Sequence, residues 1–382
     1  MEFTQLGLSA PLLKAIVTQS YQQPYPIQEQ AIPAILAGHD VLGIAQTGSG
    51  KTASFVLPIL EQFRNKKPAK NRFVNVLVLV PTRELALQVA TVFQELGAYL
   101  PGRVKTLAVF GGVSINPQMK AISGTEILVA TPGRLLDLVE SRAVYLSEVE
   151  VLVLDEADKM LNLGFADEIN RLLALLPKKR QNLLFSATLA DDIKAIKANL
   201  LREPVVIAVE EKTEENELDL IKQVAYRVSQ ERKGPFLRYL IKHENIIQTL
   251  VFVSSVRNAD NLVVKLHKNG IEAMAMHSDK SQGARTEALR RFKTGQLRVL
   301  VATDLASRGI DINLLPFVIN YDLPRSPKDY VHRIGRTGRA GATGTAISLI
   351  TPEDEHHFSI ILKKMGKPVE MRESAEVNLQ GV

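Results

Sequence analysis

Short runs of apolar, mostly β-branched residues alternate along the chain with longer stretches in which apolar residues recur every three or four positions. The short runs predict buried strands, and the longer stretches predict amphipathic helices. In the first half the predicted strands are residues 41–45, 74–80, 104–110, 127–130, 149–154 and 182–185. Helices are predicted between them, among others at residues 84–96 and 167–176. Strands that alternate with helices indicate a mostly parallel sheet covered by helices on both faces.

The alternation stops at residues 208–219, a segment with little to bury. A single lysine there stands against the acidic residues Glu210, Glu211, Glu214, Glu215, Glu217 and Asp219. This composition predicts a solvated, flexible linker. The alternation then resumes, with strands predicted at residues 249–253, 272–276, 299–302, 317–321 and 344–350, and helices at 259–268 and 284–293. The sequence therefore predicts two α/β domains, residues 1–207 and 220–382, joined by an acidic linker.

Composition is compatible with two globular domains. The chain has 382 residues, and a domain usually takes about 100–200 of them. Hydrophobic residues make up 46% and cysteine is absent, so neither a disulfide nor a thiolate metal site can form. No apolar run approaches the ~20 residues of a membrane-spanning helix, and residues 1–10 lack the pattern of a signal peptide. We therefore expect a soluble, cytoplasmic protein with no membrane partner.

The net charge of +6 is distributed unevenly, because the acidic linker masks how basic the rest of the chain is. A basic balance suits a polyanionic partner such as nucleic acid. Many proteins of other function are mildly basic too, so charge alone leaves the partner open.

A glycine-rich loop, QTGSGKT at residues 46–52, follows the first predicted strand and precedes a predicted helix. Gly48 and Gly50 allow main-chain N–H groups to surround a phosphate, where the helix dipole adds positive charge. Lys51 can reach the β- and γ-phosphates, and Thr52 can bind Mg²⁺. We predict that this loop binds a nucleoside triphosphate through Thr47, Gly48, Ser49, Gly50, Lys51 and Thr52.

Two adjacent acidic residues end another predicted strand, in the tetrapeptide Asp155-Glu156-Ala157-Asp158. Ligand sites in parallel sheets lie at that carboxyl edge. We therefore assign Asp155 to Mg²⁺, together with Thr52, and Glu156 to orienting and deprotonating the attacking water. The cluster alone would also fit a solvated turn, and the P-loop upstream favours the catalytic role.

This tetrapeptide is the one that names the DEAD-box helicases, and the chain resembles this family of superfamily 2 over residues 3–350. Ala45 stands where the general P-loop pattern has Gly, and Ala is the usual residue of this family there. The resemblance implies two tandem RecA-like domains, ATP and Mg²⁺ as cofactors, and RNA as partner. It also implies RNA-stimulated ATP hydrolysis, coupled to domain closure and to local, non-processive unwinding of short RNA duplexes.

Phe3 and residues 21–28 resemble the family's Q motif. The resemblance implies that Gln28 reads the adenine edge and that Tyr21 stacks on the ring. Two residues depart from the motif: Ser20 stands where Gly is usual, and Tyr25 where Thr is common. As structure alone, the segment predicts a Pro-rich turn before a helix.

Three further segments of the first half follow predicted strands and resemble the family's RNA-backbone motifs, namely PTRELA from residue 81, GG from residue 111 and TPGR from residue 131. Threonine hydroxyls, arginines and glycine N–H groups suit phosphate contacts that position a strand without reading bases. Individually, each segment would pass as an ordinary turn. The RNA contacts implied here are Pro81, Thr82, Arg83, Gly111, Gly112, Thr131, Pro132, Gly133 and Arg134.

Ser186-Ala187-Thr188 ends the last strand predicted in the first half. In the family this segment links the ATP state to RNA handling, so the resemblance implies a coupling role for Ser186, Thr188 and Asp158. The alternative is that the hydroxyls only cap the helix that follows.

The second half carries no P-loop but does carry the motif HRIGRTGR at residues 332–339. Arg336 and Arg339 are three residues apart, one turn if this stretch is helical, so both can reach the same phosphates. A guanidinium on the γ-phosphate stabilises charge in the transition state. We therefore predict that both arginines complete a catalytic set with Glu156 and Lys51.

Shorter motifs of the second half precede this one. Residues 251–255 resemble motif IV, and Arg285 belongs to a QxxR element. The resemblance implies RNA contacts by Arg285 and Thr303. It implies that ATP binds to Gly309 and Asp311, with Asp311 on the ribose.

Residues 111–119 and 277–286 are most similar to the bacterial RhlE-like branch, which usually carries a basic tail. This chain ends in neutral, polar residues, as expected either of a tail-less relative or of a truncated core, and without a tail we expect weak choice among RNA substrates. We expect a monomeric core, with the ribosome or the RNA-degradation machinery as candidate partners.

Two alternative functions stay open. One is an ATP-dependent RNA clamp that does not hydrolyse, which the intact Glu156, Arg336 and Arg339 argue against. The other is a DNA translocase of the same superfamily, which the Q motif and the tetrapeptide argue against. A phosphate-release assay, and competition of RNA with DNA for ATPase stimulation, would distinguish them.

Overall fold

The computed structural model describes residues 2–45, 48–66, 71–102, 104–189, 191–209, 221–244, 246–304, 315–338 and 344–379. Contacts divide the chain into two compact units, Met1–Glu211 and Lys212–Val382. The segment expected to be a linker begins inside the first unit, because Ala208 is the last residue of a strand. Residues 210–219 of that segment lie outside the described residues.

The first unit contains a seven-stranded sheet in the order β3-β4-β2-β5-β6-β1-β7. Its strands are β1 (Val41–Ile44), β2 (Val76–Leu79), β3 (Thr106–Val109), β4 (Ile127–Ala130), β5 (Val151–Leu154), β6 (Gln181–Ser186) and β7 (Val205–Ala208), and they pair in parallel. Its helices are η1 (Phe3–Gln5), α1 (Ala10–Thr18), α2 (Pro26–Leu36), α3 (Lys51–Phe63), α4 (Arg83–Gly97), α5 (Ile115–Ala121), α6 (Pro132–Glu140), α7 (Ala157–Asn162), α8 (Ala166–Leu175) and α9 (Asp191–Leu200).

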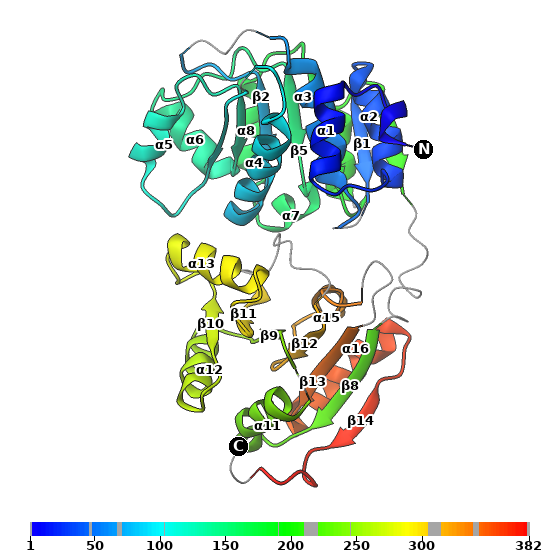
Figure 1. Ribbon diagram of the computed structural model, residues 1–382, viewed down its shortest axis with the longest axis vertical. Coiled ribbons are helices and arrows are strands. Elements are labelled where there is room, and N and C mark those ends of the chain that lie inside the picture. The colour runs from blue at the N-terminus through cyan, green and yellow to red at the C-terminus, as the bar shows by residue number, and fades with distance from the viewer. Residues whose placement is uncertain are drawn as a thin grey trace. The chain divides into compact units, whose positions relative to one another are not determined.

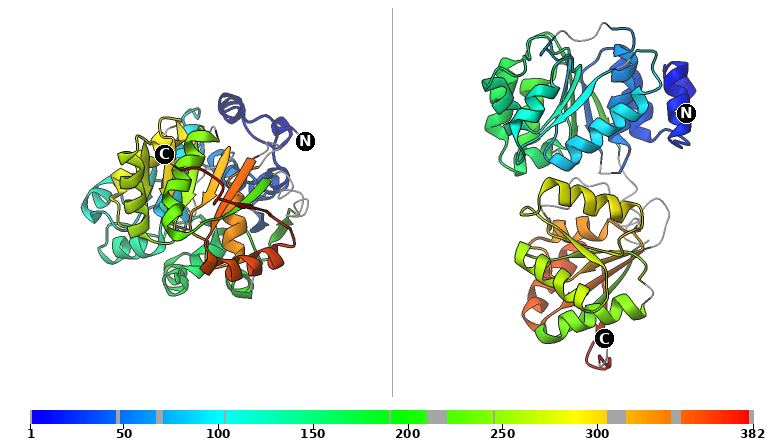
Figure 2. Two further views of the ribbon diagram at one scale, coloured as in Figure 1. Left: turned by 90° about the horizontal axis from the view of Figure 1, so that it is seen from below. Right: turned by 60° about the vertical axis from the view of Figure 1, so that its left-hand side comes forward.

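Helices cover both faces of this sheet, as Figures 1 and 2 show. Successive residues of a strand point to opposite faces. Val76 and Val78 of β2 therefore pack with residues of α1 to α4, whereas Leu77 and Leu79 pack with residues of α6 to α9. Because both faces are buried, the central strands are apolar throughout instead of alternating with polar residues.

The second unit repeats the arrangement, with a seven-stranded sheet in the order β10-β11-β9-β12-β13-β8-β14. Its strands are β8 (Ile221–Arg227), β9 (Thr249–Phe252), β10 (Ala273–Met276), β11 (Val299–Ala302), β12 (Phe317–Asn320), β13 (Gly344–Ile350) and β14 (Glu370–Glu373), again paired in parallel. Its helices are α11 (Gln230–His243), α12 (Val256–Lys268), α13 (Gln282–Lys293), α15 (Pro327–Ile334), η2 (Pro352–Asp354) and α16 (Glu355–Met365). The core on one face includes α11 and α12, and the cores on the other include α13, α15 and α16.

All eleven strands predicted from the apolar runs are present, with ends that differ by a few residues at most, and the α/β architecture is confirmed. Three strands were not predicted: β7, β8 and β14. β14 has the sequence EMRE and is a strand only because β8 pairs with it, at the edge of the sheet. Edge strands need not be apolar, so composition does not reveal them.

Among the described helices, none combines the length and apolar character needed to cross a bilayer.

Candidate active site

The phosphate-binding loop lies between β1 and α3, at the carboxyl edge of the first sheet. Lys51 begins α3, and Gly50 before it adopts the left-handed conformation (φ 85°). A Cβ atom on Gly50 would lie 2.5 Å from Nε2 of Gln28, so a side chain fits only if neighbours move. Nζ of Lys51 donates to the carbonyl of Ala45 at 2.5 Å, which closes the loop on itself. Thr47 lies outside the described residues.

Asp155 and Glu156 follow β5 at the same edge, close to Lys51. Asp155 is buried, and burial raises its pKa to about 6, although the nearby Lys51 acts to lower it. Burial lowers the pKa of Lys51, against the attraction of Asp155 and Glu156. The lysine and both carboxylates therefore form one coupled electrostatic site.

Glu156 has an unusual backbone conformation, since its φ of 53° and ψ of 46° are left-handed. Such a conformation in a residue other than glycine costs on the order of 1–3 kcal/mol and tends to occur at functional sites. Nζ of Lys159 donates to Oε1 of Glu156 at 2.6 Å. The other carboxylate oxygen, Oε2, is buried and has no hydrogen-bond partner. The site thus presents one carboxylate oxygen that can accept a proton.

The tripeptide Ser186-Ala187-Thr188 contacts the end of the acidic tetrapeptide. The main-chain N–H of Ala187 donates to Oδ1 of Asp158 at 3.4 Å. The Ser186 hydroxyl donates to the carbonyl of Thr188 at 2.8 Å and accepts from the Thr188 N–H at 3.3 Å. The Ser186 hydroxyl is therefore engaged inside the tripeptide, and the main chain of the tripeptide is joined to Asp158.

Gln28 joins the segment of the Q motif to the phosphate-binding loop. Its Nε2 donates to the Gly50 carbonyl at 3.0 Å, and its Oε1 accepts from the Tyr25 N–H at 3.0 Å. An amide side chain has two donor hydrogens and two acceptor lone pairs, so one of each remains for a ligand. The ring of Tyr21 stacks on Phe3, with centroids 6.4 Å apart. The predicted turn before a helix is confirmed, because α2 begins at Pro26.

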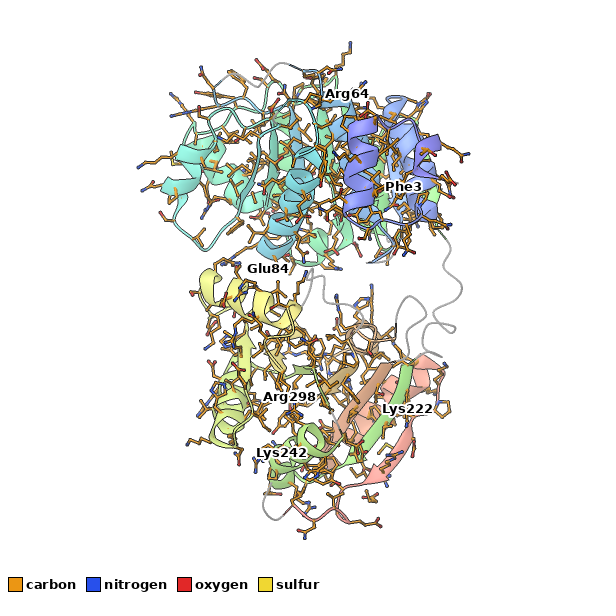
Figure 3. All side chains as sticks on the ribbon, viewed as in Figure 1. Phe3, Arg64, Glu84, Lys222, Lys242 and Arg298 are labelled. Carbon is orange, nitrogen blue, oxygen red and sulfur yellow. The ribbon has the colours of Figure 1, made fainter. Side chains whose placement is uncertain are left out.

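The three segments assigned to RNA backbone lie at the carboxyl ends of β2, β3 and β4, which are neighbours in the sheet. Arg83 comes into contact with Gly112, because a Cβ on Gly112 would lie 2.0 Å from Nη2 of Arg83. Thr82 caps α4 by accepting from the Leu85 N–H at 3.3 Å. Glu84, next to Arg83, marks this end of α4 in Figure 3.

Arg134, which the sequence assigned to RNA, is more enclosed than we expect of a side chain that contacts RNA. It is buried, and its guanidinium donates to the Val113 carbonyl at 2.8 Å and to Asp137 at 3.3 Å. Its remaining nitrogen, Nη1, has no hydrogen-bond partner. Thr131, Pro132 and Gly133 precede it, at the end of β4 and the start of α6.

In the second unit, Arg285 lies on α13, and Thr303 follows β11, where its N–H donates to the Met276 carbonyl at 3.4 Å. The condition that this stretch is helical is not met at Arg336, because α15 ends at Ile334. Instead, Arg336 lies in the turn that follows, where its carbonyl accepts from the Leu315 N–H at 3.1 Å. Gly309, Asp311 and Arg339 lie outside the described residues.

Sequence reasoning gave no role to three buried or half-buried charged residues of the second unit: Lys233, Asp322 and Arg333. Arg333 lies inside the motif at residues 332–339, which was a usable signal. Lys233 and Asp322 are 89 positions apart, and nothing local in the sequence pairs them.

Two parallel sheets of RecA type, with a P-loop and an acidic pair at the carboxyl edge of one, define a nucleotide-hydrolysing enzyme. Family models match in both units: DEAD/DEAH box helicase over residues 25–196, and helicase conserved C-terminal domain over residues 232–341. The chain is 41% identical over 366 residues to the DEAD-box ATP-dependent RNA helicase CshA of Geobacillus kaustophilus, a match that covers 95% of this chain and 77% of that protein. It is also 41% identical over 354 residues to CshA of Bacillus subtilis, covering 92% and 70%.

Solved structures agree with this. S. cerevisiae Dbp5 bound to RNA and ADP BeF3 is 33% identical, with a TM-score of 0.83 and coverage of 98% of this chain and 96% of that chain. A DEAD box protein from Methanococcus jannaschii is 36% identical, with a TM-score of 0.54 and coverage of 97% and 99%. The chain therefore belongs to the DEAD-box family of ATP-dependent RNA helicases, and its activity is ATP hydrolysis coupled to the remodelling of RNA. The RhlE-like branch stays a prediction, since the relatives named above are CshA proteins.

Proposed function

We propose that ATP is hydrolysed at the carboxyl edge of the first sheet, with Glu156 as the residue that orients and deprotonates the attacking water. The observation that carries this proposal is the buried oxygen Oε2 of Glu156, which has no hydrogen-bond partner. A general base must lie within hydrogen-bond reach of the proton that it takes. Lys159 holds the other oxygen at 2.6 Å, so the direction of the carboxylate is fixed.

Mg²⁺ fits the oxygen donors beside the loop. This ion is usually bound through one or two carboxylates together with substrate phosphates, and it keeps several waters. Asp155 supplies a carboxylate, and Thr52 supplies a hydroxyl in the first turn of α3. Bound there, the ion would neutralise negative charge that develops on the phosphates.

Adenine recognition falls to Gln28 and Tyr21. The amide of Gln28 is fixed by Tyr25 and Gly50 and keeps one donor and one acceptor, which is the pair that an adenine edge requires. Because Gln28 also holds the Gly50 carbonyl, adenine binding and the conformation of the phosphate-binding loop are linked. The proposed ATP-binding set is completed by Thr47, Gly48, Ser49, Lys51, Gly309 and Asp311.

RNA would bind through its phosphates, at the carboxyl edges of both sheets. In the first unit, Nη1 of Arg134 is a buried donor without a partner, and the guanidinium of Arg83 lies against Gly112. In the second unit, Arg285 and Thr303 are the proposed contacts. Such contacts position a strand without reading bases, so binding should weaken with salt and vary little with sequence.

ATP and RNA together would draw the two domains closed, with the acidic segment of residues 210–219 as the hinge between them. Closure would bring Arg336 and Arg339 to the nucleotide held by Lys51, and Asp158 with Ser186 and Thr188 would couple the ATP state to RNA. Each ligand then tightens the binding of the other, typically by roughly 1–3 kcal/mol. We place this activity in the cytoplasm, in a monomer, with the ribosome or the RNA-degradation machinery as partners.

The closure is tested with one fluorophore in each domain, which the absence of cysteine in the chain makes simple. Lys179→Cys and Lys268→Cys place the labels at exposed positions. The distance between labels should shorten with RNA and a non-hydrolysable ATP analogue together, and far less with either alone. Arg336→Ala should reduce the change. Full closure with the analogue alone, or none with both ligands, would contradict the coupling and leave the family assignment intact.

A further inference from the structure

The second unit contains a buried charge that no helicase motif explains. Lys233 lies on α11 and is 2% exposed. Its ammonium group is 3.2 Å from Oδ1 of Asp322 and 3.8 Å from Oδ2 of Asp354, and it lies 5.2 Å from the ring centre of Tyr321. Burying an ion pair costs desolvation energy that an apolar pair would avoid. A buried pair of this kind therefore calls for a role other than stability.

Asp322 uses its second carboxylate oxygen to hold the turn after β9. Oδ2 accepts from the N–H of Ser254 at 2.8 Å, from its hydroxyl at 2.9 Å, and from Nδ2 of Asn258 at 3.2 Å. Burial works against the charged carboxylate, but Lys233 and the bonds from Ser254 outweigh it and lower the pKa of Asp322. Ser255, the next residue, caps α12 by accepting from the Asn258 N–H at 3.1 Å. One charged side chain thus holds Ser254 and Asn258, at the turn from β9 into α12.

The main chain of Asp322 holds a second element, through Arg333 of α15. Nη1 of Arg333 donates to the Asp322 carbonyl at 2.6 Å and to Oδ1 of Asn320 at 3.2 Å. The guanidinium also donates two hydrogen bonds to Asp304, from Nε to Oδ1 at 2.5 Å and from Nη2 to Oδ2 at 2.7 Å. Paired bonds of this type are strong and fix orientation. Asp304 directly follows Thr303, the proposed RNA contact.

We propose that Asp322, anchored by Lys233, is a positioning residue for RNA binding. It fixes the Ser254 turn through its carboxylate and, through Arg333 and Asp304, the turn that carries Thr303. The inference rests on the proposed RNA role of Thr303 and deepens it. Asp322 joins the ends of β9 and β12 to α15, and Arg333 joins α15 to Asp304. Displacement of Asp322 is therefore transmitted to the turn that carries Thr303 but not to the nucleotide loop of the first unit.

The test measures ATPase rates against RNA and against ATP separately, in Lys233→Met and Asp322→Asn. We expect the RNA concentration for half-maximal stimulation to rise roughly tenfold, the size expected when one charged, buried hydrogen bond is lost. ATP affinity without RNA should stay within about twofold, since the nucleotide loop lies in the other unit. Lys242→Met is the matched control, an exposed lysine of the same helix (Figure 3), and should behave as wild type. Lys233→Arg keeps the charge and should restore much of the RNA affinity.

A purely structural role makes a different prediction, which the double variant Lys233→Met/Asp322→Leu distinguishes. Removing both charges should recover the thermal stability lost in Lys233→Met, because no unpaired charge stays buried. The Ser254 turn still lacks its acceptor, so RNA half-saturation should stay high. Recovery of RNA affinity together with stability would overturn the proposal, as would single variants that match Lys242→Met. Thr303→Val tests the underlying contact independently. If that variant alone keeps wild-type RNA affinity, Thr303 is not an RNA contact. An effect of the Asp322 variants on RNA affinity would still be measured separately.

Discussion

Lys159 holds Oε1 of Glu156 at 2.6 Å, one helical turn away, while the second oxygen of the same carboxylate is buried without a partner. The ion pair fixes the direction of the carboxylate, and the strained backbone of Glu156 places it at the start of α7. A fixed, buried base with one unoccupied oxygen is suited to a water molecule that attacks a phosphate.

Glu156→Gln should therefore abolish hydrolysis but not binding. The amide keeps the shape of the side chain but cannot take a proton, so turnover should fall by roughly 100-fold or more. ATP and RNA affinities, measured by equilibrium titration, should change little. Glu140→Gln, an exposed carboxylate paired with Arg171, is the control and should keep full activity. Wild-type turnover in Glu156→Gln would refute the assignment.

Gly50→Ala should weaken ATP binding strongly. The new Cβ would lie 2.5 Å from Nε2 of Gln28 and 2.7 Å from the Tyr25 ring, and the backbone is left-handed. Gly124→Ala is a matched control, because Gly124 has a φ of 71° and nothing within 4 Å of an added Cβ. Both variants bear a similar backbone cost of about 1–2 kcal/mol, but only Gly50→Ala should lose ATP affinity, by at least roughly tenfold. Equal ATP affinities in the two variants would show that the contact with Gln28 is unimportant.

Adenine nucleotides should be preferred over guanine nucleotides, with Gln28 as the cause. Guanine has the acceptor O6 where adenine has the N6–H donor, so the fixed amide of Gln28 would leave polar groups unpaired. Gln28→Ala should narrow the difference in kcat/KM between ATP and GTP, and it should also raise the KM for ATP. Equal kcat/KM for the two nucleotides in the wild-type protein would contradict this interpretation of the Q motif.

The stability of the nucleotide-free protein should depend on pH through Asp155. Burial raises the pKa of Asp155 to about 6, above its ordinary value of 3.8, so the folded state binds the proton more tightly than the unfolded state. Its contribution to stability is then full below the unfolded pKa and is lost as the pH rises through about 6. Mg²⁺ binding has the opposite trend, because it needs the charged carboxylate.

Urea unfolding of wild type and Asp155→Asn between about pH 4 and pH 8 provides the measurement. The stability of the wild type relative to the variant should fall as the pH rises through that window. The Mg²⁺ concentration for half-maximal hydrolysis by the wild type should increase as the pH falls below about 6. A stability difference that does not vary with pH would argue against a raised pKa.

Much of the fold follows from local sequence. Runs such as residues 76–79 and 151–154 must be buried on both faces, and an apolar segment of that length between helices has few other structures available. The glycine-rich loop and the tetrapeptide come directly after such strands, so chain order alone brings Lys51, Asp155 and Glu156 to one edge of a parallel sheet.

Other features depend on partners that are distant in the sequence. β14 is a polar segment that forms a strand only because it pairs with β8. α15 ends before Arg336, and the Arg336 carbonyl accepts from the Leu315 N–H. The buried pair of Lys233 with Asp322 joins positions 89 residues apart. The positions of strands and helices follow from the burial of apolar side chains, and the order of apolar residues can be read directly from the sequence. Which strand edges pair, and which buried charges pair, depends on the groups that meet after the chain has folded. Only the tertiary structure therefore decided these pairings.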